Sequence, residues 1–372
     1  MVERKIIDLY GVRKRKGEIG IEIEVEGENL PTVGLPDKWN VTNDGSLRGG
    51  GFEYVLRNPC TRGGVKKALN DLKICFARVE TEVYDSQRAG VHIHINCQEF
   101  SIRQMFSFIC LYIVFEKLLI NYCGETRKGN LFCLSSEDAE ALIIQLIQDA
   151  RSMTVSGVVN DDFRYAAMNL AALGKFGSVE FRSLQTPVDI LDIERWVNIL
   201  LCIKDKALEI EYPREIVEGM SMDGPEQYME AVFGPLTQYL NCREAEKWIT
   251  EGARRVQFLA YEATNTFERN KKKRRSRSKR VSDYEIWEGL RGGVEPDDGQ
   301  LIDMGGTYYY WNEGECQWEN ITKEDFLADC VLSGREDYIP REDRERPVPG
   351  PRLGRRPVYR ELDWEIDNTG TD

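Results

Sequence analysis

A strict alternation of apolar and acidic residues near the start of the chain limits what residues 18–27 can fold into. One side of the alternation consists of Ile19, Ile21, Ile23 and Val25. The other side consists of Glu18, Gly20, Glu22, Glu24 and Glu26. Because successive side chains of a β-strand point to opposite faces, the segment is predicted to be a strand with one apolar and one acidic face. Such a row of carboxylates repels itself unless water or cations screen it, so the acidic face is either solvated or a binding surface for divalent metal.

A second alternating segment contains both histidines of the 372-residue chain. Residues 91–96 read Val-His-Ile-His-Ile-Asn, so His92, His94 and Asn96 share one face of a predicted strand. Two imidazoles on one polar face favour a functional role over a structural one. The His-x-His spacing suits zinc, and imidazole N–H groups can equally bind phosphate oxygens.

A third segment, residues 177–184, repeats the pattern. Glu180 and Arg182 lie on the face opposite Val179 and Phe181. Glu beside Arg is often only a surface ion pair, but a guanidinium also fits carboxylate or phosphate groups. Three strands of this kind together predict a sheet with one face packed on helices and the other facing a cleft.

Two further segments add candidate residues. Residues 43–47 read Asn-Asp-Gly-Ser-Leu, a turn signal that places Asp44 shortly before a strand-like run beginning at Glu53. Arg164 precedes an apolar segment that contains Asn169. Each of these signals is weak by itself.

Helical patterns separate the strand-like segments. Helices are predicted at residues 101–122, 135–152 and 186–209, and mostly helical structure at 216–270. The first of these is apolar almost all round, which predicts a buried helix. Ser135 and Asp138 are expected to begin the second helix as a capping box. Thr186 and Pro187 are expected to begin the third, as N-cap and first helical residue.

The composition changes at residue 270. The expected parts are a folded region at 1–270 (core about 15–210, helical extension about 216–270), a basic linker at 271–282, a small aromatic-rich β module at 283–337, and an extended or disordered tail at 338–372. Residues 271–280 include eight basic residues, which favour a linker or contact with an acidic partner over sequence-specific nucleic-acid binding. Residues 308–311 and Trp318 predict short strands, with Gly305 and Gly306 as a turn.

The composition also excludes several classes of protein. Hydrophobic residues make up 41% of the chain, which excludes wholesale disorder, and 50 basic against 63 acidic residues give a net charge of −13, unfavourable for binding polyanions. The ten cysteines form no CxxC pair and the charged N-terminus lacks a signal-peptide core, so we expect a cytoplasmic protein. The longest apolar run, residues 105–115, is shorter than the roughly 20 residues that a bilayer requires, so no membrane association is expected.

The order of these motifs resembles the amidoligase family of carboxylate–amine ligases, which are related to glutamine synthetase and glutamate–cysteine ligase. The matching motifs are, in order, Gly20-x-Glu22-x-Glu24, Asp44-Gly45-Ser46-Leu47 with Glu53, Gly90-x-His92-x-His94, Arg164 with Asn169, and Glu180-x-Arg182. Each motif is weak alone, and the five in sequence are more specific. The resemblance covers about residues 15–210, and it does not extend beyond 280.

The resemblance implies an α+β fold in which an antiparallel sheet curves into a funnel, with helices on its outer face. It also implies ATP-dependent formation of an amide bond through an acyl phosphate, with Mg²⁺ or Mn²⁺ as the metal. Phosphoryl transfer to a carboxylate gathers several negative oxygens, so the site needs cations and guanidinium groups. The substrates would be a carboxylate and an amine, and a peptide or protein is one candidate carrier of the carboxylate.

The resemblance also assigns residues to roles. The implied metal ligands are Glu22, Glu24, Glu53 and Glu180. The implied contacts to ATP phosphates or a metal-bound carboxylate are His92, His94 and Arg182. The implied catalytic residues are Arg164 and Arg182, and we expect Asp44 to be the catalytic base. In these roles the two arginines neutralise the transferred phosphoryl group, and Asp44 removes a proton from the attacking amine.

Two alternatives remain open. The His-x-His motif followed by Glu99 also fits a cupin-type metal-dependent β-barrel enzyme that uses His92 and His94. Glu99, however, lies on the apolar side of the alternation, opposite to the two histidines. A non-catalytic accessory protein would keep the ligase fold only to bind nucleotide, because fold does not fix function. Retained zinc or iron without nucleotide binding would favour the first, and nucleotide affinity without ADP release would favour the second.

Overall fold

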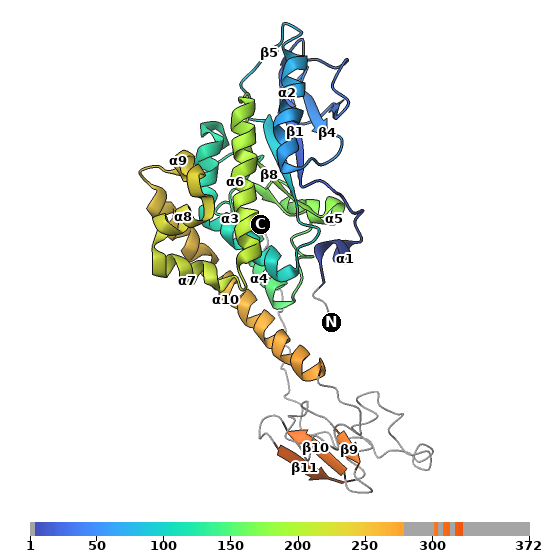
Figure 1. Ribbon diagram of the computed structural model, residues 1–372, viewed down its shortest axis with the longest axis vertical. Coiled ribbons are helices and arrows are strands. Elements are labelled where there is room, and N and C mark those ends of the chain that lie inside the picture. Colours follow the sequence, from blue (N-terminus) through green and yellow to red (C-terminus); the bar gives the residue numbers. More distant parts are fainter. Residues whose placement is uncertain (1–3, 279–300, 304–307, 313–316, 323–372) are drawn as a thin grey trace, which may run out of the picture. The chain divides into compact units, whose positions relative to one another are not determined.

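The three alternating segments form neighbouring strands of one antiparallel sheet in the computed structural model (Figure 1). In spatial order, its six strands are β3 (Trp39–Thr42), β4 (Phe52–Leu56), β1 (Ile19–Val25), β6 (Gly90–Asn96), β8 (Ser178–Gln185) and β7 (Met168–Asn169). The structure describes residues 4–278, 301–303, 308–312 and 317–322. The sheet is open, with β3 and β7 at its edges, and its combination with helices confirms the mixed α and β architecture predicted from the sequence.

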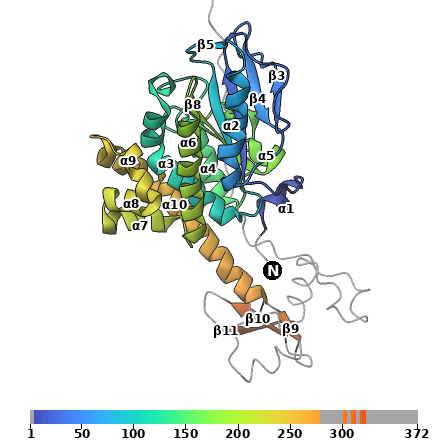
Figure 2. The same cartoon turned by 45° about the horizontal axis from the view of Figure 1, so that its top comes forward.

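The alternation decides which face of the sheet is buried against helices. The covering helices are α2 (Val65–Phe76), α3 (Ile102–Cys123) and α6 (Ile190–Glu209). Helices α2 and α6 run side by side over the sheet in both views (Figures 1 and 2). Phe181 of β8 packs against Phe108 and Tyr112 of α3, with ring centroids 5.9 and 5.0 Å apart. The other face carries the polar side chains, as the period of two requires.

Helix α3 is the central core helix. Ser101 caps it through a capping box with Gln104, in which each side chain bonds the other residue's backbone N–H. By length and composition α3 is the one described helix that could cross a membrane, but 83% of its most apolar window is buried inside the fold. The predicted buried helix at 101–122 is therefore confirmed.

Two helix starts differ from the prediction. The Ser135 hydroxyl bonds Asp138, but this pair forms a turn, and α4 begins only at Glu140. The turn is fixed because Ser136 donates to the buried carboxylate of Glu116 on α3. Helix α6 is capped by Asp189, which accepts from the Leu191 N–H at 2.9 Å, so Thr186 is not its N-cap and Pro187 lies outside it.

The remaining helices complete the first unit of the chain, which ends at Asn270. The predicted helical stretch at 216–270 is confirmed by α7 (Arg214–Asp223), α8 (Pro225–Phe233), α9 (Thr237–Leu240) and α10 (Ala245–Ser278). Shorter helices are α1 (Ile6–Tyr10), α4 (Glu140–Arg151), α5 (Ala172–Phe176), η1 (Arg62–Gly64), η2 (Glu125–Arg127), η3 (Asp161–Phe163) and η4 (Gly234–Leu236). A separate two-stranded pair joins β2 (Gly27–Glu28) to β5 (Glu82–Val83).

The second unit runs from Lys271 and contains a small antiparallel sheet. Its strands, in the order β11 (Gln317–Ile321), β10 (Tyr308–Asn312) and β9 (Leu301–Asp303), include the predicted strand segments at 308–311 and Trp318. The backbone of the basic run continues α10 as far as Ser278. Residues 279–282, Gly305, Gly306 and the tail at 338–372 lie outside the described residues, and a folded module at 283–337 stays a prediction.

Candidate metal centre

The strand register brings the predicted acidic and imidazole residues into rows across the polar face. Glu22 of β1 lies opposite His92 of β6, and Glu24 lies opposite Glu53 of β4. His94 of β6 lies opposite Glu180 of β8. Because directly paired residues of antiparallel strands share a face, side chains from four strands converge here. We call Glu22, Glu24, Glu53, His92 and Glu180 the carboxylate–imidazole cluster.

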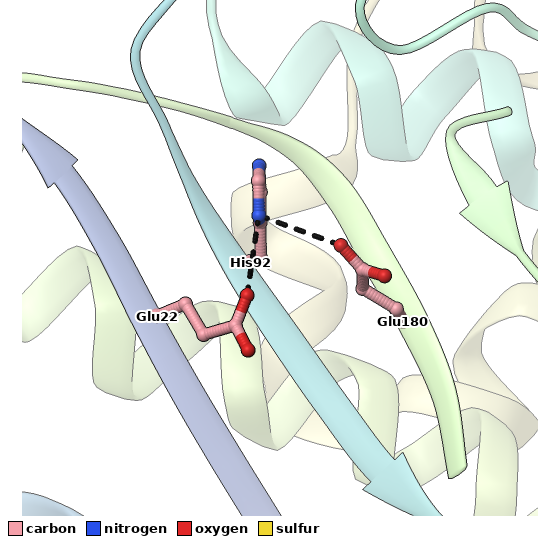
Figure 3. Close-up of side chains that lie close together, drawn as sticks. All are labelled: Glu22, His92 and Glu180. Atoms are coloured by element: carbon pink, nitrogen blue, oxygen red, sulfur yellow. Dashed lines mark ion pairs between the residues drawn. The ribbon is translucent and has the colours of Figure 1, made fainter. Parts of the chain in front are cut away.

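His92 occupies the middle of the cluster and is only 3% exposed. Its Nδ1 atom lies 3.6 Å from Glu22 Oε2 and 3.4 Å from Glu180 Oε1, and its Nε2 atom lies 3.5 Å from Glu24 Oε2. Figure 3 shows the imidazole between Glu22 and Glu180, which reach it from the strands on either side. A single ring thus faces three carboxylates.

Two sets of ligand atoms in the cluster are close enough to hold a metal ion. Glu22, His92 and Glu180 form one set, and Glu24, Glu53 and His92 form the other, with the atoms of each set within 4.8 Å of one another. Carboxylate oxygens with an imidazole nitrogen suit Mg²⁺, Mn²⁺ or Zn²⁺. The donor set therefore fits the divalent metal that the sequence predicts, and leaves open which ion is preferred.

Further hydrogen bonds orient the carboxylates. The Asn169 amide donates to Glu180 Oε2 at 2.7 Å, and the Gly90 N–H donates to Glu24 Oε2 at 3.0 Å. The Thr42 hydroxyl donates to Glu53 Oε2 at 3.0 Å. Partners of this kind fix the direction in which a metal ligand presents its oxygen.

The charges within the cluster divide its carboxylates into two groups. Burial alone would raise the pKa of Glu22, but the imidazoles of His92 and His94 outweigh it and hold that pKa below its ordinary value. Burial also opposes ionisation of Glu180, yet His94 and Arg182 lower its pKa. Glu22 and Glu180 therefore stay ionised.

The other two carboxylates are shifted in the opposite direction. Burial raises the pKa of Glu24. Burial and the negative charge of Glu22 raise the pKa of Glu53 to about 7. A divalent cation between these oxygens would favour the ionised forms, since an opposite charge nearby lowers a carboxylate pKa. The metal-free cluster is thus short of positive charge.

His94 and Arg182 border the cluster. The His94 Nε2 atom lies 3.3 Å from Glu22 Oε1, and its Nδ1 atom lies 3.2 Å from the Ser178 hydroxyl. Burial lowers the pKa of His94, but its contacts with Glu22 more than offset this and raise it overall. Arg182 forms an ion pair with Glu180 through Nη1. His94 and Arg182, like His92, therefore lie on the same face as the predicted metal ligands.

The structure does not bring all predicted residues together. Asp44 accepts a hydrogen bond from the Ser46 N–H of its own turn, although its charge is close enough to raise the pKa of Glu24. Arg164 contacts the neighbouring Tyr165, donating to the phenol oxygen at 2.9 Å and stacking on the ring. Within the described part of the chain, no contact links Arg164 to the cluster.

Sequence reasoning missed several supporting residues. Asn169 was noticed only as a neighbour of Arg164, and Thr42 was not noticed at all. Arg127 was also missed, although its buried guanidinium donates to backbone carbonyls of the strand carrying Arg182. A motif search does not find such residues because their role depends on partners distant in sequence.

Comparison with known proteins adds no identification. No protein-family model matches the chain, and no curated protein matches it. A function for the chain is therefore inferred from its residues and from the geometry of the polar face.

Proposed function

We propose that this protein is an ATP-dependent carboxylate–amine ligase that uses Mg²⁺ or Mn²⁺, as the resemblance to the amidoligase family implies. The observation that carries the proposal is the convergence of Glu22, Glu180 and His92 from three adjacent strands on one polar face. The motifs that supply these residues are separated by up to about 160 positions in the sequence, yet the fold collects them in one place. Arg182 adds a guanidinium to the same face.

The proposed reaction has two steps. A carboxylate oxygen of the first substrate attacks the γ-phosphorus of ATP, and ADP leaves, which forms an acyl phosphate. The amine nitrogen of the second substrate then attacks the acyl carbon, phosphate leaves, and the amine loses a proton. Bound Mg²⁺ or Mn²⁺ would neutralise the phosphate oxygens. Glu22 and Glu180 would hold this metal, and Arg182 would stabilise the charge on the transferred phosphoryl group.

The architecture fits the same proposal. An antiparallel sheet with helices on its apolar face and candidate metal ligands on its polar face supports the proposal, since such a sheet would form one wall of the expected funnel. The open edges at β3 and β7 do not favour the cupin-type alternative, which requires a closed barrel. A non-catalytic accessory protein would have the same geometry, so activity must decide between this possibility and the ligase.

A single incubation tests the proposed activity. The full chain is mixed with ATP, Mg²⁺ and a cell extract whose own enzymes have been inactivated. Mass spectrometry then searches for products that are lighter than their summed precursors by one water. ADP release is followed in parallel. We expect a condensed product that depends on ATP and metal. Nucleotide binding without ADP release under any combination of carboxylate and amine would instead show an accessory protein.

Two variants connect the activity to the cluster. Glu22→Gln and Glu180→Gln remove one ligand charge each and are expected to abolish metal-dependent ATP turnover while the protein stays folded. Glu116→Gln is the control, because Glu116 is buried like Glu180 but belongs to α3 and accepts hydrogen bonds from Ser136. Normal turnover in both cluster variants would exclude Glu22 and Glu180 from the metal site.

A further inference from the structure

A pocket of about 180 Å³ opens beside the carboxylate–imidazole cluster. Glu22 and His94 line it on the side of the cluster. Its other lining residues include Gly20, Arg15, Arg57 and Phe176. The pocket therefore joins the metal centre to a group of residues that has no role in metal binding.

Gly20 makes room for the pocket. It lies in the same row of β1 as Glu22 and Glu24 and is paired with His94. Its backbone is ordinary strand, so no unusual conformation requires glycine there. A Cβ atom at this position would lie 3.2 Å from the His94 Cβ atom, in tight contact. The neighbouring residues of the polar face have larger side chains, so the missing side chain at Gly20 leaves part of the pocket open.

One buried imidazole nitrogen at this pocket contacts Glu22 but makes no hydrogen bond. His94 lines the pocket, and its Nε2 atom is buried without a hydrogen bond, since its approach to Glu22 at 3.3 Å lacks hydrogen-bond geometry. The Phe176 ring meets the imidazole edge-on at 5.8 Å and helps to fix it. Buried polar groups are normally satisfied, so an orphaned atom in a pocket indicates a place for a ligand group.

The pocket carries both signs of charge. Arg15 and Arg57 line it, and neither guanidinium has an acidic partner among residues 4–278. Arg57 is oriented by donating to the Trp39 carbonyl at 3.2 Å. Glu18 also lines the pocket but is already paired with Arg62 and Lys204. Glu22 also lines the pocket, although its carboxylate faces His92 and His94 as well. A ligand would therefore meet two guanidinium groups at one side of the pocket and this shared carboxylate at the other.

We propose that this pocket binds a small α-amino acid, with its carboxylate on Arg15 and Arg57 and its amino group beside Glu22 and His94. In the ligase, this amino acid is the amine substrate, an assignment that rests on the proposed function above. The separated charges match those of a zwitterion, and Phe176 provides an apolar wall for a short side chain. A free amine would leave the guanidinium groups without a partner, and a simple carboxylate would bring no positive group to the Glu22 side of the pocket.

The size of the pocket also restricts the ligand. Its volume is below the range of about 300–1,000 Å³ that is usual for pockets holding drug-sized molecules. A whole ATP molecule is too large to fit inside, so the pocket would enclose at most part of a nucleotide. A small amino acid is of the right order.

Binding is tested without ATP, so the result does not depend on ligase activity. The full chain is screened against all twenty common amino acids by thermal shift, with and without Mn²⁺, and affinities are measured by calorimetry. L-valine is compared with isovalerate, which lacks the amino group, and with isobutylamine, which lacks the carboxylate. We expect at least one small apolar amino acid to bind, and each single-group analogue to bind at least tenfold more weakly than its parent. No binding by any amino acid, or equal binding of isovalerate and valine, would overturn the proposal.

Variants locate the site. Arg57→Gln is expected to weaken amino-acid binding at least tenfold, because a hydrogen bond to a charged group contributes roughly 1.5–3 kcal/mol. Gly20→Ala is expected to weaken it by a similar factor by filling part of the pocket, with Mn²⁺ affinity changed less than twofold. Arg13→Gln is the control, because Arg13 is exposed and does not line the pocket. Unchanged binding in both pocket variants would refute the site, whereas absent ADP release with intact binding would refute only the ligase.

Discussion

Replacing Arg127 tests whether a residue outside the cluster positions it. Arg127 ends η2 and is 1% exposed. Its guanidinium donates to four backbone carbonyls: Gln87 at 3.3 Å and Ala89 at 3.2 Å before β6, and Arg182 at 2.6 Å and Ser183 at 3.2 Å within β8. The described residues offer it no carboxylate partner. One side chain thus ties together the two strands that carry His92 and Glu180.

The local geometry shows why the strands need this tie. The pairing of β6 with β8 shifts register between Val91 and Ile93, next to His92. Gly90 is required beside it, because a Cβ atom there would lie 2.6 Å from the Arg127 Nη2 atom. The guanidinium therefore fills the space that an irregular ladder leaves, and supplies donors to carbonyls near the irregularity.

The expected loss of stability follows from these contacts. Arg127→Met keeps most of the stem but removes four hydrogen bonds from a charged donor, each contributing about 1.5–3 kcal/mol. The neutral variant no longer buries a charge, and this gain offsets several kcal/mol of the lost stability. We therefore expect a net loss of about 3–5 kcal/mol, because four backbone carbonyls lose a charged donor. At about 2–4 °C per kcal/mol for a domain of this size, the midpoint should fall by roughly 6–20 °C.

Two measurements separate positioning from mere stabilisation. Thermal unfolding by circular dichroism gives the stability, and Mn²⁺ titration by electron paramagnetic resonance gives metal affinity at a temperature where each variant is folded. Arg127→Met should bind Mn²⁺ about 10–100-fold more weakly. Arg127→Lys should recover part of the stability but not the affinity, since an ammonium lacks the planar fork. Arg13→Met is the surface control, because Arg13 is exposed. Unchanged Mn²⁺ affinity in folded Arg127→Met would refute the positioning role.

Two more predictions follow from the cluster and from the division of the chain. The pKa of Glu53 is raised from 4.5 to about 7 in the fold, so the metal-free folded protein holds this proton more tightly than the unfolded chain does. The stability that protonated Glu53 contributes is fully present below pH 4.5 and is lost as the pH rises through 7. Glu53→Gln should therefore gain melting temperature relative to the wild type between pH 5 and 8 without metal; a difference independent of pH would contradict this. The basic run and the residues after it are expected to recruit an acidic or macromolecular partner. Ending the chain after Asn270, at the boundary between the two units, should therefore spare ATP hydrolysis but reduce ligation. Undiminished ligation would argue against recruitment.

The alternating patterns predicted much of the fold because they restrict side chains to one face. The period of two in residues 18–27, 91–96 and 177–184 located β1, β6 and β8 and the shared polar face. Helix starts were less predictable, because Asp189 competes with Thr186 as a cap and Ser136 is held by Glu116. Local sequence does not contain these tertiary competitors.

The site was predictable to the extent that its residues belong to strands. Glu22, His92 and Glu180 are held by register, so the pattern that placed the strands also placed them. Arg164 belongs to a turn after η3, where its side chain follows the local path of the chain and meets Tyr165. Arg127 could not be found, because nothing in its neighbourhood distinguishes a guanidinium that will be buried.

The amino-acid pocket has a consequence for the base that accepts the amine proton. The charge of Asp44 acts on Glu24, whereas the pocket is lined by Gly20. Gly20 precedes Glu24 by four residues on β1, which places the two residues roughly 13 Å apart along the strand. If the amine binds in the pocket, the His94 Nε2 atom, which lines the pocket and makes no hydrogen bond, is the closer acceptor. His94→Asn should then reduce amide formation from an amino acid at least a hundredfold, as expected for loss of a general base, while partial ATP hydrolysis persists. Asp44→Asn should keep amide formation within a few-fold of the wild type. The reverse result, with ligation lost in Asp44→Asn and kept in His94→Asn, would restore Asp44 as the base and move the amine away from Gly20.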